Sequence, residues 1–235
     1  MTTPVTYQLE ESFATITIDD GKVNAMSVAT LSALNAALDR AVVDRAVVVL
    51  TGRPGVFSAG FDLQVLAAGG PDAQKMVAMG FELAHRLLSF PTPVVIACSG
   101  HAIAMGVFLV LAGDYSLGAD GPFKIGANEV AIGITMPHFG VEMCRQRLTP
   151  AHFNRAVMFS EMFTPTDAVP AGFLDRVVPA AELQAEAGKI AAALAKLNIT
   201  AFAASKMRVR EQALKAVRAA IDTDGGLLTT TRNAG

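Results

Sequence analysis

The chain has 235 residues but no tryptophan, only two cysteines and two tyrosines, and 17% charged residues, fewer than the roughly 25% of an average soluble domain. Cys98 and Cys144 are too few for a disulfide framework, and neither lies in a CxxC or Cys/His spacing that would hold zinc. The cysteine content therefore favours a reducing compartment. Because 19 basic residues face 21 acidic ones, giving a net charge of −2, no positive field would collect phosphate backbones, and we expect no nucleic-acid partner.

Two further features are missing from the sequence. The first residues, 1–11, contain neither a basic segment nor an apolar one, so we predict no signal peptide and a cytoplasmic protein. The stretch 87–113 has the length of a membrane span and no formal charge, apart from the charge that His101 carries when protonated. Pro91, Pro93 and the break at 99–101 favour a buried strand, turn and helix there instead, so no membrane association is expected.

Apolar residues are abundant, at 52% of the chain, and their spacing predicts alternating strands and helices. Residues 13–19 alternate between apolar and polar side chains, which is typical of a half-buried strand. Ser27 is a good N-cap for a helix whose leucines recur at helical spacing. Residues 46–51 form a continuous apolar run, which predicts a strand covered on both faces.

The same cycle continues along the chain, and this alternation predicts an α/β layer protein with substantial parallel pairing. The further predicted elements are a loop over 52–60, a helix over 72–89, a strand over 94–97, a helix ending near residue 111, short strands over 115–117 and 123–125, and a helix starting at 149–150.

The sequence predicts helices in the last part of the chain. One helix with a single apolar face is predicted after residue 180, and a second helical stretch is predicted over 200–221. We therefore divide the chain into a core domain, residues 1–195, and a helical C-terminal region, residues 196–235, suited to packing over the core or joining subunits. The basic residues of the second stretch are predicted to be a solvated face: Lys206, Arg208, Arg210, Lys215 and Arg218.

Two loops rich in small residues follow predicted strands and are candidates for chemistry. In residues 57–63 and 99–106, small side chains allow a ligand to approach the backbone, and free N–H groups there can bind an oxygen with developing negative charge. The second loop also precedes a helix, whose first amides favour an anion. Each loop taken alone is equally compatible with ordinary tight-turn chemistry.

A third candidate is Glu129, the only formal charge between Lys124 and Glu142. A carboxyl group among apolar neighbours tends to have a raised pKa, which suits a general acid or base. The alternative is a glutamate that faces solvent at a turn.

Together these three segments resemble the crotonase superfamily, also called the enoyl-CoA hydratase/isomerase family, over nearly the whole chain. The resemblance implies a crotonase core folded as a spiral of repeated β-β-α units, with a helical C-terminal region that packs against other subunits in a homotrimer or dimer of trimers. It also implies an acyl-CoA thioester as substrate, in fatty-acid metabolism. Coenzyme A is then part of the substrate, and no metal or redox cofactor is expected, because the thioester itself acidifies the α-carbon.

The family pattern assigns roles to individual residues. The backbone N–H groups of Phe61 and Met105 match the two oxyanion donors, in segments where the family has F-x-A-G-x-D-L and N-G-x-A-x-G-G-G motifs. Glu129 matches the family's second glutamate and would move the proton. The residues expected to line the substrate are Ser58, Ala59, Gly60, Phe61, Asp62, Leu63, Met105, Gly106 and Phe108.

Two departures from the pattern bear on the reaction. Phe108 stands where hydratases of the family carry their first glutamate, and His138 replaces a glycine of the turn that seats their water. One carboxyl group suffices for a Δ3,Δ2-enoyl-CoA isomerase, which takes a proton from C2 and returns it to C4 in a dry site. We therefore predict isomerase chemistry. The alternatives are hydration by Glu129, alone or with His138 as an acid, and a non-catalytic acyl-CoA-binding protein.

Two other residues carry side chains that can do chemistry. His101 is expected to be a structural histidine rather than a catalyst. Ser99 lies only two residues before it, and no positioned carboxylate accompanies the two, which argues against a Ser-His-Asp hydrolase.

Overall fold

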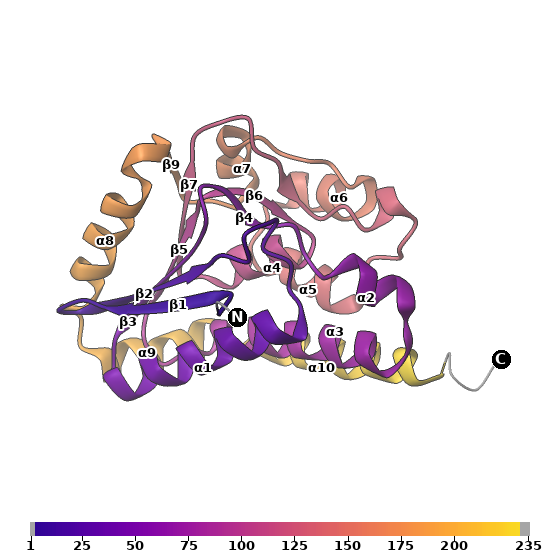
Figure 1. Ribbon diagram of the computed structural model, residues 1–235, viewed down its shortest axis with the longest axis horizontal. Coiled ribbons are helices and arrows are strands. Elements are labelled where there is room, and N and C mark those ends of the chain that lie inside the picture. Colours follow the sequence, from indigo (N-terminus) through magenta and orange to yellow (C-terminus); the bar gives the residue numbers. More distant parts are fainter. Residues whose placement is uncertain (1–2, 231–235) are drawn as a thin grey trace.

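The computed structural model describes residues 3–230 and shows an α/β protein (Figure 1). The strands are β1 (Val5–Leu9), β2 (Phe13–Ile18), β3 (Val47–Gly52), β4 (Gly55–Ser58), β5 (Val94–Cys98), β6 (Gly100–Ile103), β7 (Tyr115–Ala119), β8 (Ile125–Gly126) and β9 (Arg176–Val178). The α-helices are α1 (Val28–Asp44), α2 (Leu63–Ala68), α3 (Gly70–Leu88), α4 (Met105–Ala112), α5 (His138–Arg145), α6 (Pro150–Phe159), α7 (Pro165–Ala171), α8 (Leu183–Leu194), α9 (Ile199–Val209) and α10 (Glu211–Thr230). Two short 3-10 helices are η1 (Val130–Ile132) and η2 (Ala180–Glu182).

The larger sheet has six strands in the order β1-β2-β3-β5-β7-β9. β1 pairs with β2 in antiparallel fashion and the remaining pairs are parallel. Every residue of β3 is buried. Val48 and Leu50 belong to the main core, whereas Val47 and Val49 belong to a second apolar cluster on the opposite face. The strand is therefore covered on both faces, as its continuous apolar sequence predicted.

The strands follow the predicted repeat. β3 and β4, β5 and β6, and β7 and β8 each form a strand-strand pair followed by helical structure. The first strand of each pair lies in the larger sheet, and the second lies in a separate three-stranded parallel sheet, β4-β6-β8. This arrangement confirms the spiral of β-β-α units and the predicted helical C-terminal region.

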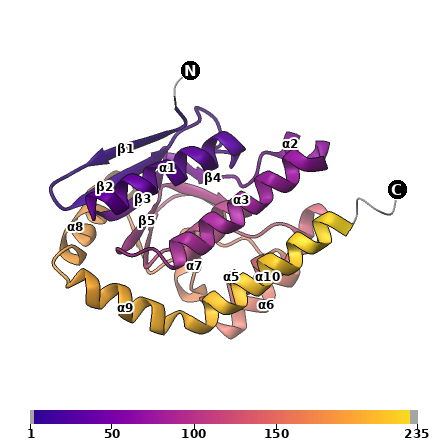
Figure 2. The same ribbon diagram turned by 90° about the horizontal axis from the view of Figure 1, so that it is seen from below.

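Helices cover the two faces of the larger sheet. α1 packs on β1 and β2 on one face, α3 lies beside α1, and α10 lies against α3 and α5 farther from the sheet (Figure 2). α8 packs on β3, β5 and β7 of the other face through Leu183, Ala187 and Ala191. The C-terminal chain is helical as predicted, but it divides at Arg210 into α9 and α10 rather than forming one stretch. Whether residues 1–195 and 196–235 form separate domains stays a prediction.

The uncharged stretch 87–113 is buried in the protein. It contains the end of α3, β5, β6 and α4, all within the core. Over residues 3–230, none of the helices combines the length and the apolar character that a membrane crossing requires.

Candidate active site

The three segments singled out in the sequence meet at one edge of the small sheet. β4, β6 and β8 are parallel neighbours, so their carboxyl ends lie together, where ligands of parallel sheets commonly bind. Residues 59–63 follow β4, the start of α4 follows β6, and Glu129 comes three residues after β8. The Ala104 N–H donates to the Gly126 carbonyl at 3.1 Å, which holds the last two segments side by side.

Gly60 brings the two predicted donors close together. Its φ of +94° is unfavourable for other residues. A Cβ atom at this position would lie 2.9 Å from the Ala104 Cβ and 3.4 Å from the Met105 nitrogen. The chain just before Phe61 therefore lies against the first residue of α4.

The N–H groups of Phe61 and Met105 are both free to bind a ligand. Met105 begins α4, so its N–H has no partner within the helix. Met26 bridges Phe61 in parallel fashion and donates to the Gly60 carbonyl at 2.8 Å, which leaves the Phe61 N–H pointing away from that bridge. Within the described chain, neither N–H donates to a backbone or side-chain acceptor. Two such donors form the kind of site that stabilises an oxyanion.

Ala104 adds backbone strain next to these donors. It has φ 51° and ψ −123°, a combination rarely adopted by residues other than glycine. Its N–H donates to the Gly126 carbonyl, and Gly60 packs closely against its side chain.

Glu129 is buried, which excludes the solvent-facing alternative. The residue is 8% exposed, and its Oε2 atom has no hydrogen-bond partner within the described chain. Burial raises the pKa of this carboxyl group, and a hydrogen bond from its own backbone N–H partly opposes the change. Burial, followed by the nearby charge of Glu129, raises the pKa of Cys144 on α5 to about 12. Such a carboxyl group can accept and release a proton under mild conditions.

Aromatic rings form an apolar wall on the α3 and α5 side of the site. The ring centroids of Phe61 and Phe81 are 6.2 Å apart, and the Phe81 ring stacks on that of Phe139 with a centroid distance of 4.0 Å. The Phe139 ring meets the Phe108 ring edge-on, with a centroid distance of 5.5 Å. Phe108 is 2% exposed. A Cβ at Gly140 would lie 2.8 Å from its ring, so the space around Phe108 is filled.

The other predicted substrate-lining residues hold the loop in place. The buried Ser58 donates to the Asn24 carbonyl at 2.7 Å and accepts from the Gly60 N–H at 3.1 Å. The Ala59 N–H donates to Val23, and the Asp62 carboxylate accepts from the first amides of α2.

Gly106, at the start of α4, has a close steric constraint. A Cβ on Gly106 would lie 2.5 Å from the Ser58 carbonyl oxygen, which explains the need for glycine there. Leu63, by contrast, is 67% exposed.

The histidines divide between structural and surface positions. The His101 Nδ1 atom accepts from the Lys124 N–H at 3.0 Å, and the ring packs edge-on against Phe123, so its predicted structural role is confirmed. His138 begins α5 and its side chain is exposed. The structure shows no contact between this ring and Glu129 among the described residues.

The sequence analysis did not predict a hydrogen-bond acceptor that α10 contributes to the start of α5. Asp224 of α10 is buried and accepts hydrogen bonds from the N–H groups of His138 and Phe139, at 3.1 and 2.8 Å. It thereby caps α5, for which Pro137 offers no side-chain cap. No local signal in the sequence marks this pairing, which spans 86 residues.

The structure corrects part of the prediction that the basic residues near the C-terminus form a solvated face. Lys206 is 6% exposed and its amine donates to Asp114 at 2.7 Å. Arg210 also pairs with Asp114, at 3.0 Å, and Arg218 pairs with Glu82. The prediction of a solvated face is wrong for Lys206 and Arg210, since both serve buried acceptors, and it holds for Arg208 and Lys215, which are exposed.

A fold and site of this kind define a crotonase, and comparison with known proteins agrees. A family model described as "Enoyl-CoA hydratase/isomerase" matches residues 8–234. The chain belongs to the enoyl-CoA hydratase/isomerase family.

Two curated relatives carry different activities in their names. The chain is 33% identical over 171 residues to human mitochondrial enoyl-CoA delta isomerase 1, covering 70% of this chain and 56% of the relative. It is 31% identical over 195 residues to carnitinyl-CoA dehydratase of Salmonella enteritidis, covering 81% and 74%. The matches to the mouse, human and rat isomerases span 56 to 65% of their length.

A solved structure supports the fold. An enoyl-CoA hydratase/isomerase family protein from Pseudomonas syringae superposes with a TM-score of 0.93 at 48% identity, covering 95% of this chain and 97% of the other.

Proposed function

We propose that this protein moves a double bond in acyl-CoA thioesters, from C3=C4 to C2=C3. The observation that carries the proposal is Phe108, a filled and buried aromatic position where the resemblance implies a hydratase would carry its first glutamate. Among the residues that the structure describes, Glu129 is the only buried glutamate. One such group is enough for a proton shuttle and leaves no second carboxylate to hold a water molecule.

The reaction follows from the positions of the three groups. The N–H groups of Phe61 and Met105 donate hydrogen bonds to the thioester oxygen. Glu129 takes a proton from C2, the electron pair of that C–H bond enters the conjugated dienolate, and the charge collects on the oxygen. The same carboxyl group then protonates C4, which leaves the double bond between C2 and C3. Each oxyanion donor is worth about 3–4 kcal/mol of barrier, and the aromatic wall keeps the dienolate away from water.

The remaining expectations belong to this proposal. Coenzyme A enters as part of the substrate, with no separate cofactor, and the protein acts in fatty-acid metabolism in the cytoplasm. We also propose a homotrimer or a dimer of trimers. Apolar side chains exposed on α6 and α9 support association, because they would be costly to leave in water: Met158, Phe159, Met207 and Val209. Sedimentation velocity would give the mass, and a monomer at micromolar concentration would contradict this part.

The test of the activity compares the parent with a Glu129→Gln variant. Both proteins are given a 3-enoyl-CoA and a 2-enoyl-CoA, and double-bond migration and water addition are followed separately. We expect the parent to isomerise and barely hydrate, and the variant to lose at least 10²-fold of migration, because an amide cannot take up the proton. Glu11→Gln makes the same chemical change at an exposed position and should leave both rates unchanged.

Other outcomes point to other functions. Dominant hydration would overturn the argument that Phe108 prevents water addition, and His138 would then be the next residue to change. One relative is named a dehydratase, so hydration should be measured. A parent that binds acyl-CoA but turns over neither substrate, with equal binding by the Glu129→Gln variant, would indicate a non-catalytic binding protein.

A further inference from the structure

The helix that starts at Met105 ends in carbonyl groups that require partners. α4 is only eight residues long and all of them are buried. Its last four carbonyls have no intrahelical donor, as in any α-helix. Gly113 follows with extended backbone rather than a left-handed cap, and its N–H donates to the Val110 carbonyl at 3.2 Å, so the other carbonyl groups at this end require donors from elsewhere.

Side chains from three other parts of the chain supply the donors. The Ser116 hydroxyl donates to the Val110 carbonyl at 3.0 Å, and the Gln146 amide donates to that of Leu111 at 2.9 Å. Arg210 donates to the carbonyls of Ala112 and Gly113 at 3.4 and 2.8 Å. Arg147 adds a longer contact to Gly113, at 3.4 Å. Every carbonyl from Val110 to Gly113 therefore has a side-chain donor.

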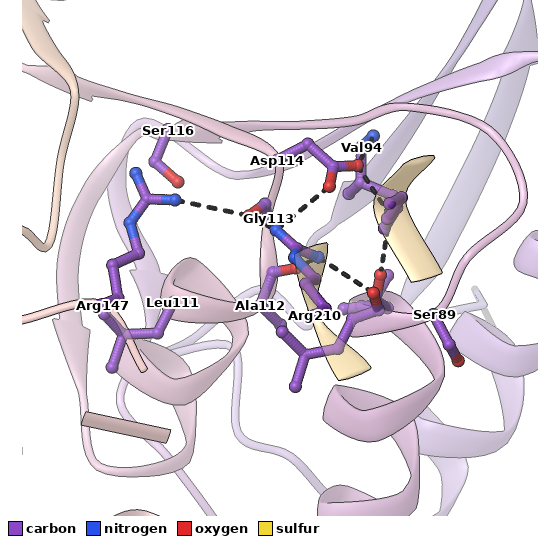
Figure 3. Close-up of polar contacts among 12 residues, drawn as sticks. Ser89, Val94, Leu111, Ala112, Gly113, Asp114, Ser116, Arg147 and Arg210 are labelled. Atoms are coloured by element: carbon purple, nitrogen blue, oxygen red, sulfur yellow. Dashed lines mark hydrogen bonds and ion pairs between the residues drawn. The ribbon is translucent and has the colours of Figure 1, made fainter. Parts of the chain in front are cut away.

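Arg210 is itself held firmly in this position (Figure 3). Its guanidinium group pairs with Asp114 at 3.0 Å, and both side chains are largely buried, at 14% and 13% exposure. Asp114 also accepts from the Val94 N–H at 2.8 Å and pairs with Lys206. A positive group at this end of a helix is also electrostatically favourable.

The same guanidinium reaches a second helix that borders the site. Arg210 donates to the Leu88 carbonyl, at the end of α3, at 3.0 Å. Gly80 of α3 lies against Phe61 and Met105, since a Cβ there would be 3.4 Å from the Met105 sulfur. One side chain thus joins the C-terminal ends of two helices that both contact the proposed oxyanion donors.

We infer that Arg210 is a positioning residue for the oxyanion site: by binding the last carbonyls of α4 and α3, it fixes where the Met105 N–H lies at the other end of α4. This inference rests on the proposed function, because that proposal makes the Met105 N–H a donor. Arg210 lies at the end of α4 opposite to Met105, so its loss should affect the rate of the chemical step rather than binding.

The test uses Arg210→Met, which removes the donors and keeps the length of the side chain. Displacement of a reacting group by 1 Å can cost about 10²-fold in rate, so a shift of a few tenths of an ångström predicts a fall in kcat of about tenfold. KM for the 3-enoyl-CoA should stay within about twofold of the parent value, because binding does not depend on a strong oxyanion contact. Arg208→Met is the matched control, since Arg208 is exposed two residues earlier on α9, and its kcat should equal that of the parent.

A second readout separates this inference from the proposed function. A 3-oxoacyl-CoA bound at saturation forms an enolate that absorbs in the ultraviolet, so its absorbance reports the oxyanion site without turnover. We expect the enolate fraction to fall in Arg210→Met and to be unchanged in Arg208→Met. If the parent does not isomerise, the proposed function fails, and this readout still decides the role of Arg210.

Several results would overturn the inference. One is a kcat and enolate fraction for Arg210→Met within twofold of the parent; another is a loss that disappears once activity is divided by the folded fraction from circular dichroism. If Arg210→Met does not fold, Arg210→Lys decides, because lysine keeps the charge but holds fewer of the carbonyls. Its kcat should fall about threefold at unchanged KM, and a kcat equal to the parent's would refute the role.

Discussion

Replacing Gly60 by alanine tests whether the two donors lie where the structure places them. The φ of +94° at this position costs an alanine about 1–2 kcal/mol. The added methyl group would lie 2.9 Å from the Ala104 Cβ, whereas carbon atoms prefer about 3.5–4.0 Å. The two segments must therefore separate by more than about half an ångström, and the methyl group would lie against Ala104 and the Met105 nitrogen.

This displacement predicts a large effect on the reaction and a smaller one on stability. We expect kcat for double-bond migration to fall about 10²-fold, as for the misplacement or loss of one donor. The free energy of unfolding in urea should fall by about 2–3 kcal/mol, from the backbone conformation plus the contact. Both quantities are measured on the same preparations, with saturating 3-enoyl-CoA for kcat.

Gly55→Ala provides the control for backbone strain alone. Gly55 has a similar φ of +85°, but a Cβ there meets no atom within 4 Å. This variant should lose about 1–2 kcal/mol of stability and keep its kcat. If folded Gly60→Ala isomerises within threefold of Gly55→Ala, the two N–H groups do not form the oxyanion site.

Three further predictions concern Glu129 and Phe108. Because burial raises the pKa of Glu129, the folded protein binds this proton more tightly than the unfolded chain, so stability from this group is lost as the pH rises through the raised pKa. The free energy of unfolding of Glu129→Gln should therefore exceed that of the parent at neutral pH by about 1–3 kcal/mol, and this gain should vanish below the ordinary carboxyl pKa. Urea titrations at several pH values measure the gain. An equal gain at low pH would contradict the prediction. In the parent, kcat/KM for migration should fall as the pH drops through the same pKa, because the base must be ionised. Phe108→Ala should lower the free energy of unfolding by about 3–5 kcal/mol. It should also raise the ratio of hydrated to isomerised product, because the cavity left by the ring admits water. An unchanged product ratio in the folded variant would show that Phe108 does not exclude water.

The sequence predicted those elements whose signals are local. Ser27 caps α1 as expected, with its side chain accepting from the Thr30 N–H. The apolar run of residues 46–51 corresponds to β3, which is buried on both faces. The strands β4 and β6 were implied only by the family resemblance and not by local pattern, because each has only four residues, includes glycine, and gains its structure from pairing across about 45 residues of sequence. Pairing at that distance leaves no periodic pattern.

The candidate site divides in the same way. The loops that carry Phe61, Met105 and Glu129 were found from small residues, an isolated charge and family resemblance, and the structure places them at one edge of a sheet. Burial of Glu129 could not be decided from the sequence, since it depends on tertiary packing by elements distant in the chain. The roles of Asp224 and Arg210 were also beyond local pattern, because their partners lie 86 and about 100 residues away.

The separation of the chain into two sheets bears on how this molecule can change over evolutionary time. In three successive repeats the first strand belongs to the six-stranded sheet and the second to the small sheet, whose loops hold the reactive groups. Substitutions in those loops can alter the chemistry at the site while the larger sheet and its apolar clusters stay unchanged. Such a division would allow relatives to differ in their reactions, and the names of two relatives describe isomerisation and dehydration. New reactions on this scaffold should therefore be sought by varying the segments after β4, β6 and β8, with the larger sheet left untouched.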